Sequence, residues 1–176
     1  MLQYSCATKK ENKRGKKVVN KYIYPGTNPE KADKVLFEVL DLCKEMKIEV
    51  YLIFGTLLGI YRDGSYLFDD NDIDLFIKTD KETRERFKKR LLKQNFELGT
   101  IPGSLPTINM HTIKDQIFID IWIKMRESLM KYYIKTKEIK YKNRMVPVPA
   151  DTEGFLEASY GEWKKRIPKS ANPFGK

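Results

Sequence analysis

The apolar residues from Val35 to Met46 recur every three or four positions, and this spacing predicts an amphipathic helix. Asn28 and Pro29 stand just ahead of the pattern, where an N-cap and a first helical residue usually lie. A short apolar run at 49–54 follows and predicts a buried strand. We therefore expect the fold to begin with a helix that packs its apolar face against this strand.

The pattern changes after this strand. A break at Gly55 ends the apolar run, and the next residues predict a short helix at 57–62. Residues 72–77 alternate polar and apolar side chains, which is typical of a strand. Asp80 is expected to cap a highly charged helix that runs to about Gln94.

The rest of the chain predicts mainly strands. Three are expected at about 96–100, 107–113 and 116–124. Lys114-Asp115 is expected to turn the last two into a hairpin, and 131–148 to form further strands or irregular structure. A final helix is expected from Asp151 or Thr152 to Tyr160. This order predicts an α+β fold with a small mixed β-sheet and flanking helices.

The formal net charge of +10 suggests a basic nucleic-acid-binding domain, but the distribution of charge argues against it. Residues 1–21 hold seven Lys or Arg and one Glu, and residues 163–176 hold five Lys or Arg and no acid. The remaining 22–162 hold 22 basic and 23 acidic side chains. Because the body of the chain is nearly neutral, nucleic acid is not the expected partner.

Cysteine usage and hydropathy point to a cytoplasmic protein. Cys6 and Cys43 are too few for a disulfide framework and lack zinc-site spacing, so both are expected to be reduced, with Cys43 in the core. No stretch approaches the roughly 18 apolar residues of a membrane span. No apolar segment follows the basic residues of the leader, so we do not expect a secretory signal.

Carboxylates gather at the start of the strand expected at 72–77. Asp72 and Asp74 are two residues apart, so they should project from one face of the strand, with Asp70 close behind. Clustered carboxylates repel one another unless a cation lies between them. Their hard oxygen atoms suit Mg²⁺ or Mn²⁺. A solvated turn is the alternative for an Asp-x-Asp pattern on its own.

Two further features complete the candidate site. Asp120 interrupts the apolar run 117–123, and a buried carboxylate needs a cation beside it. If its strand lies beside that of Asp72 and Asp74, Asp120 completes a metal-binding triad; pairing with a Lys or Arg is the alternative. Gly55 and Thr56 lie in a strand-to-helix turn, where free N–H groups and a hydroxyl can hold a phosphate.

Several other site types are absent from the sequence. An EF-hand calcium loop would need Gly at Leu75 and Glu at Lys81. Neither the Gly-x4-Gly-Lys phosphate loop nor the Gly-x-Gly-x-x-Gly dinucleotide motif occurs. The single histidine, His111, is expected to have a structural role, which leaves no base for a Ser-His-Asp hydrolase.

Two motifs follow one another in the chain: Phe54-Gly-Thr-Leu-Leu-Gly-Ile-Tyr-Arg62 and then Asp70-Asn-Asp-Ile-Asp-Leu75. Together they resemble the LicD/fukutin family of the nucleotidyltransferase-like superfamily, whose third carboxylate follows on a later strand, as Asp120 does. Tyr160-Gly-x-Trp163 is similar to the closing motif of that family. The matching segments span roughly 33–168. Asp69 is a departure, because members usually carry an aromatic residue there.

The resemblance implies a transferase that moves a phospho-substituent, such as phosphocholine, from a CDP-activated donor to a hydroxyl of a sugar or glycan. It implies that the carboxylates at 70, 72, 74 and 120 hold Mg²⁺ or Mn²⁺, with Asp120 also able to accept the proton of the acceptor. Gly55, Thr56 and Arg62 would bind the donor phosphate, although Arg62 can instead pair with Asp63 or Asp70. Tyr160 and Trp163 would line the substrate pocket or pack in the core.

The distribution of charge and the resemblance together give the expected domain organisation, and two alternative functions stay open. We expect a basic, flexible leader at 1–21, one nucleotidyltransferase-like catalytic domain at 22–168 and a basic tail at 169–176. One alternative is transfer of a nucleoside monophosphate to a small molecule, protein or RNA. The other is a non-enzymatic nucleic-acid-binding module. The basic ends can also contact an anionic membrane or a polyanion, which would make the cytoplasmic protein membrane-peripheral.

Overall fold

The structure is a computed structural model that describes residues 10–11, 17–18, 28–68, 70, 72–99, 109–133 and 135–166. The basic tail expected at 169–176 and Cys6 lie outside these residues. Two short strands, β1 (Lys10–Glu11) and β2 (Lys17–Val18), pair antiparallel.

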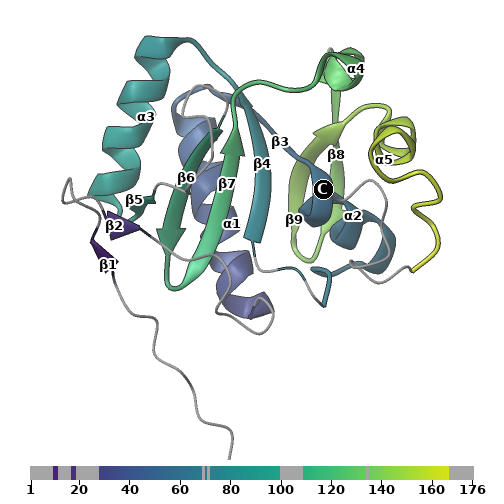
Figure 1. The fold of residues 1–176 in the computed structure, drawn as a ribbon, viewed down its shortest axis with the longest axis horizontal. Helices are drawn as coiled ribbons and strands as arrows, with labels where there is room; N and C mark the ends of the chain where they lie inside the picture. Colours follow the sequence, from purple (N-terminus) through teal and green to yellow (C-terminus); the bar gives the residue numbers. More distant parts are fainter. Residues whose placement is uncertain are drawn as a thin grey trace, which may run out of the picture.

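A five-stranded mixed sheet forms the centre of the molecule, in the order β3-β4-β7-β6-β5 (Figure 1). The strands are β3 (Glu49–Leu52), β4 (Asp72–Lys78), β5 (Glu97–Gly99), β6 (Asn109–Lys114) and β7 (Ile117–Trp122). β4 and β7 run parallel, whereas the other neighbouring pairs run antiparallel. The expected α+β fold with a small mixed sheet is therefore confirmed.

The two long helices cover one face of this sheet. α1 (Pro29–Glu45) lies behind the sheet in Figure 1, and α3 (Lys81–Lys93) lies toward its β5 edge. Asn28 and Asp80 cap these helices by accepting backbone N–H groups at 3.0 and 2.8 Å, as predicted. The apolar residues of β4 and β7 that alternate with the aspartates are fully buried, namely Ile73, Leu75, Ile77, Ile119 and Ile121. Because side chains alternate along a strand, the aspartates project from the opposite face.

A second layer of elements lies beside β3. It contains the antiparallel hairpin β8 (Thr136–Tyr141) and β9 (Arg144–Pro149), with β9 in contact with β3. Helix α4 (Glu127–Met130), which a 3₁₀ turn at Lys131–Tyr133 follows directly, precedes the hairpin in the chain, and α5 (Thr152–Tyr160) follows it. Lys142 and the hydroxyl of Tyr141 (2.8 Å) both bind the buried carboxylate of Asp33 on α1, which ties the hairpin to the main body.

Three boundaries differ from the sequence prediction. The strand expected at 49–54 ends at Leu52, and the short helix begins early as α2 (Phe54–Leu58). It then widens into a π-helix, η1 (Gly59–Asp63). The turn expected at Lys114-Asp115 was wrong: it falls at Asp115 and Gln116, whose φ angles of 50° and 70° suit a tight hairpin turn.

Candidate active site

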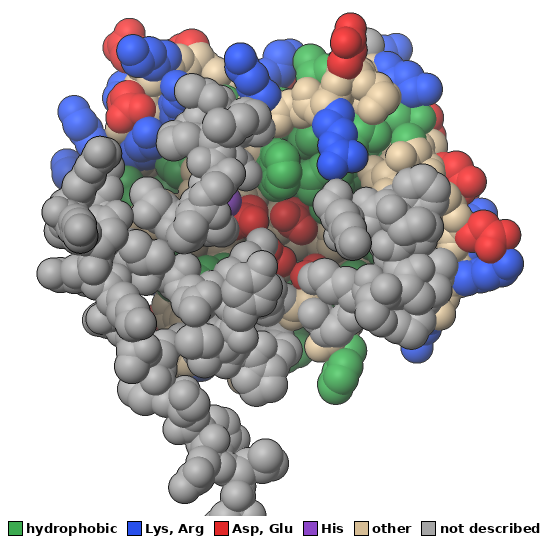
Figure 2. All heavy atoms as spheres, in the orientation of Figure 1, with side chains coloured by type: hydrophobic (Ala, Val, Ile, Leu, Met, Phe, Trp, Pro, Cys, Tyr) green, Lys and Arg blue, Asp and Glu red, His purple; other side chains and the backbone are tan. Residues whose placement is uncertain are grey.

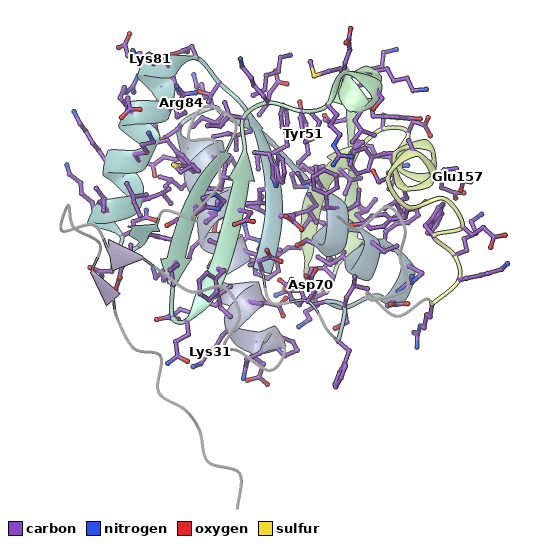
Figure 3. The ribbon with its side chains drawn as sticks, viewed as in Figure 1. Lys31, Tyr51, Asp70, Lys81, Arg84 and Glu157 are labelled. Carbon is purple, nitrogen blue, oxygen red and sulfur yellow. The ribbon has the colours of Figure 1, made fainter. Side chains whose placement is uncertain are left out.

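Three carboxylates converge at the start of β4. One oxygen each from Asp70, Asp72 and Asp74 lies within 4.8 Å of the others. Asp70 and Asp72 are buried, each only 5% exposed, and Asp74 is half-buried. Figure 3 shows Asp70 near the start of β4, and Figure 2 shows acidic side chains gathered near the middle of this face. We call these three residues the carboxylate cluster.

Gly55 allows Asp70 to join the cluster. A Cβ atom built on Gly55 would lie 2.0 Å from Asp70 Oδ2 and 3.1 Å from its Cγ, closer than atoms can approach. The carboxylate therefore occupies the space that any side chain at position 55 would fill. Gly55 was predicted to approach a phosphate, and this role stays a prediction; the contact in the structure is to Asp70.

Thr56 fixes the position of the strand that carries the cluster. Its buried hydroxyl oxygen accepts the backbone N–H of Asp74 at 2.8 Å. The preceding turn is held in place as well, because the N–H of Ile53 donates to the carbonyl of Asp74 at 3.2 Å. The predicted contact of Thr56 with a phosphate is not tested by these bonds, which show a positioning role.

The residue before Gly55 adopts a strained backbone conformation. Phe54 has a φ of 43°, which is unusual for a bulky side chain. Its ring packs edge-on against Trp122 at 5.3 Å between centroids and lies 5.9 Å from Phe155. These aromatic contacts hold the strained turn that brings Gly55 against Asp70.

Asp120 lies beside the cluster with a partner that the sequence did not reveal. The two strands are neighbours, the condition for the expected triad, and Asp120 is the register partner of Asp74 across the parallel β4–β7 pair; it is 6% exposed. Its Oδ1 lies 2.7 Å from Nδ1 of His111, which is its register partner on β6. A metal-binding role for Asp120 stays a prediction, because the compact group of oxygens is formed by the carboxylate cluster.

Tyr160, at the end of α5, lies within the electrostatic field of the cluster. Burial raises the pKa of Tyr160 well above its usual value, and the negative charges of Asp74, Asp70 and Asp72 raise it further. The side chain is therefore a protonated hydroxyl beside the carboxylates. This position agrees with a place in the substrate pocket, which remains a prediction.

Arg62 and Trp163 contact each other and residues outside the carboxylate cluster. The guanidinium of Arg62 binds both carboxylate oxygens of Asp63, at 3.1 and 2.8 Å, and its Nη1 donates to the carbonyl of Trp163 at 3.0 Å. These contacts favour the ion-pair alternative for Arg62 over a phosphate-binding role. Trp163 is buried against Tyr61, at 5.8 Å between ring centroids, which favours the core-packing alternative.

A hollow beside Trp163 is not lined by the carboxylate cluster. It has a volume of about 470 Å³ and is lined by Glu153, Gly154, Glu157, Glu162, Trp163, Lys164 and Lys165. Within the described part of the chain, no helix combines the length and apolarity needed to cross a membrane.

The carboxylate cluster has the donor set of a divalent cation site. Three hard oxygen ligands converge, two of them buried, on a rigid strand start. A cation there would relieve the repulsion between the carboxylates and would attract a phosphate group. The residues present therefore fit Mg²⁺ or Mn²⁺, with Asp120, His111 and Tyr160 around them.

Comparison with solved structures shows the fold. The antibiotic-resistance factor ANT(2'')-Ia, solved in solution, matches with a TM-score of 0.53 at 13% identity, over 69% of this chain and 66% of that one. An antigenic nucleotidyltransferase-like protein from Paracoccidioides brasiliensis matches with a TM-score of 0.50 at 14% identity, over 75% of this chain and 66% of that one. The chain thus covers slightly less than two thirds of either structure, and the shared feature is the nucleotidyltransferase-like fold.

Comparison of sequences shows the family. No curated protein matches the chain. The family described as LicD/FKTN/FKRP, nucleotidyltransferase domain, matches residues 47–145, which is more than half of the chain and includes the carboxylate cluster, Asp120 and His111. Both the family and the fold place the chain among the transferases. The chain belongs to the LicD/FKTN/FKRP nucleotidyltransferase-domain family.

Proposed function

We propose that the protein is a metal-dependent transferase that moves a phospho-substituent, such as phosphocholine, from a CDP-activated donor to a hydroxyl of a sugar or glycan. The observation that carries the proposal is the carboxylate cluster, whose oxygens lie within 4.8 Å of one another at the start of β4. Membership of the LicD/FKTN/FKRP family supports transfer chemistry at this position.

The carboxylates of Asp70, Asp72 and Asp74 would hold Mg²⁺ or Mn²⁺, with Asp120 as a further ligand. When bound, the cation supplies positive charge that neutralises the donor diphosphate and the leaving group. Gly55 keeps Asp70 in the cluster, and Thr56 keeps the backbone of Asp74 in place. A rigid site of this kind needs little rearrangement when the donor binds.

The proposed transfer step forms one bond, breaks one bond and moves one proton. The attacking hydroxyl oxygen forms a bond to the phosphorus that carries the substituent. The bond from that phosphorus to the bridging oxygen breaks, and the bridging oxygen keeps the electron pair and leaves as part of a nucleoside monophosphate. The proton of the hydroxyl passes to Oδ2 of Asp120, whose Oδ1 is held by His111. Tyr160 is a protonated hydroxyl near the cluster and can donate a hydrogen bond to a phosphate oxygen.

Titration calorimetry with CDP-choline and other CDP-linked donors tests the proposal. We expect wild-type protein to bind a donor in the presence of Mg²⁺ and not after chelation. Asp72→Asn combined with Asp74→Asn should abolish this binding and turnover, whereas Asp115→Asn, a carboxylate removed in the exposed β6–β7 turn, is the matched control. Donor binding that is absent in wild type, or unchanged in the double variant, would refute the proposal.

Nucleotidyl transfer is the second candidate, because the fold is shared with nucleotidyltransferase-like proteins. It would use the same cluster but break the bond on the other side of the bridging oxygen. The mass of the product separates the two reactions, since the acceptor gains a phospho-substituent in one and a nucleotide in the other. A non-enzymatic nucleic-acid-binding module would instead show salt-dependent binding that survives loss of the carboxylates.

The basic ends extend the proposal to the location of the protein. With +6 at residues 1–21 and +5 at residues 163–176, they are suited to an anionic membrane surface or a polyanionic glycan near the acceptor. We propose a cytoplasmic, membrane-peripheral protein on this ground. Sedimentation with phosphatidylserine vesicles, compared with phosphatidylcholine vesicles and with chain lacking residues 1–21, tests this contact.

A further inference from the structure

One ring nitrogen of His111, Nδ1, contacts the candidate active site, whereas the other, Nε2, has no part in the proposed mechanism. Nδ1 of His111 and Oδ1 of Asp120 lie 2.7 Å apart, and both side chains are 9% exposed. A carboxylate can only accept a hydrogen bond, so the proton of this bond belongs to Nδ1. In the neutral ring, Nε2 is then a hydrogen-bond acceptor without a proton.

Nε2 of His111 is buried and has no hydrogen-bond partner among the residues that the structure describes. A buried polar atom without a partner destabilises a fold by about 1–3 kcal/mol. The backbone bonds of β6 and β7 already fix the register that pairs His111 with Asp120, so the fold does not depend on Nε2. An atom of this kind is expected to bind something that the chain itself does not supply.

The location of His111 limits what that ligand can be. Asp74, Asp120 and His111 are successive register partners across β4, β7 and β6, so they form one row on one face of the sheet. Because Nδ1 of His111 lies 2.7 Å from Oδ1 of Asp120, the imidazole ring is a direct neighbour of the carboxylate that is proposed to take the proton of the attacking hydroxyl. A hydroxyl bound to Nε2 would therefore belong to the same acceptor molecule as a hydroxyl bound to Asp120.

We propose that Nε2 of His111 accepts a hydrogen bond from a second hydroxyl of the acceptor, the neighbour of the hydroxyl that attacks. His111 thereby selects acceptors with two adjacent hydroxyl groups, as sugars and polyols have, over simple alcohols. The proposal rests on the proposed transferase function for the identity of the acceptor, but the state of Nε2 can be measured without any donor.

The first experiment is ¹⁵N NMR of untagged, histidine-labelled protein, in which the single histidine gives an unambiguous imidazole spectrum. We expect a proton on Nδ1 and none on Nε2. The Nε2 signal should move when ethylene glycol is added and should stay in place with 1,2-dimethoxyethane, which has no hydroxyl to donate. A proton on Nε2, or equal shifts with both compounds, would overturn the proposal.

The second experiment measures transfer from CDP-choline to ethylene glycol and to 2-methoxyethanol, which has a hydroxyl to attack but no second hydroxyl to donate. His111→Asn retains a side-chain N–H near the position of Nδ1 but has no counterpart of Nε2, so it separates support of Asp120 from hydroxyl recognition. We expect the ratio of transfer to ethylene glycol over 2-methoxyethanol to fall about tenfold, the effect of one hydrogen bond. A variant that keeps the wild-type ratio would overturn the proposal.

The two experiments fail in different ways. If wild type turns over no CDP-choline but Nε2 responds to the diol alone, the proposed donor is wrong and the role of His111 stands. If turnover depends on Mg²⁺ but Nε2 carries a proton, the transferase function stands and the role of His111 is wrong. His111→Gln, which places its amide near Nε2 instead, should recover part of the diol preference if its oxygen faces the ligand.

Discussion

Gly55→Ala is expected to weaken divalent-cation binding while the backbone itself tolerates alanine. The new Cβ would lie 2.0 Å from Asp70 Oδ2, so the carboxylate must move by an ångström or more and leave the cluster. Position 55 lies in α2, where alanine is a better helix former than glycine by about 1 kcal/mol. The loss should therefore appear in cation affinity more than in folding.

We expect the affinity for Mn²⁺ to fall about 10- to 100-fold, the range found when the support of a metal ligand is removed. This corresponds to about 1.4–2.7 kcal/mol of binding free energy. Electron paramagnetic resonance of free Mn²⁺ gives the affinity, and urea unfolding without metal gives the stability.

Gly154→Ala is the matched control, because its Cβ would lie 2.3 Å from Asp151 Oδ2, in the N-terminal cap of α5. It creates the same kind of clash away from the cluster, so it should lower stability and leave Mn²⁺ affinity unchanged. The reasoning is refuted if Gly55→Ala binds Mn²⁺ as wild type does, or if both variants lose affinity equally.

Four further predictions follow from single contacts. Thr56→Val leaves the N–H of Asp74 without its acceptor and should destabilise the fold by about 1–3 kcal/mol in urea unfolding, whereas Thr56→Ser should not. Arg62→Ala should lower the thermal midpoint but change donor affinity far less than the double aspartate variant does, since its contacts tie the C-terminal segment to η1. Hydrogen bonds from Arg62 chiefly, and also from Arg166, lower the pKa of Asp63; the stability that this gives is present above about pH 4 and is lost as pH falls through the lowered pKa. The difference in stability between wild type and Asp63→Asn should therefore shrink from pH 7 to pH 3. Burial raises the pKa of Cys43 to about 12, so peptide mapping after iodoacetamide treatment should find it unmodified in native protein and alkylated in urea.

The sequence predicts the elements that have a strong local signal. Helix α1 follows from its apolar spacing and from Asn28, whose side chain caps it as expected. The strand with Asp72 and Asp74 follows from strict alternation, because one face of β4 is buried and the other carries the carboxylates. The sequence left open whether the strand of Asp120 lies beside that of Asp72 and Asp74, and the structure shows that the two strands are parallel neighbours with Asp74 opposite Asp120.

The position of His111 shows what a sequence pattern leaves open. A turn at Lys114-Asp115 would pair Asn109 with Asp120, whereas the observed turn at Asp115 and Gln116 pairs His111 with Asp120. Both turns preserve the same alternation, so hydrophobic pattern cannot choose between them. The observed turn has positive φ angles at Asp115 and Gln116. Neither residue is glycine, so the sequence carries no local signal for a turn at these two positions.

Two other features depend on tertiary contacts. The need for glycine at position 55 arises from Asp70, fifteen residues away in sequence, and no local rule reports such an approach. Arg62 lies in a motif typical of a donor site, yet the nearby carboxylate of Asp63 and the carbonyl of Trp163 engage its guanidinium. In both cases a partner brought in by the fold decides the role of the residue.

We propose that the carboxylate cluster supports cation-dependent transfer of a phospho-substituent. Mass spectrometry of the products of CDP-choline with the protein, glycerol and Mg²⁺, alongside a sample treated with chelator, tests this proposal. We expect CMP and phosphocholine linked to glycerol or water, formed only when Mg²⁺ is present. A glycerol product that carries the nucleotide, or the same products at the same rate in the presence of chelator, would contradict it.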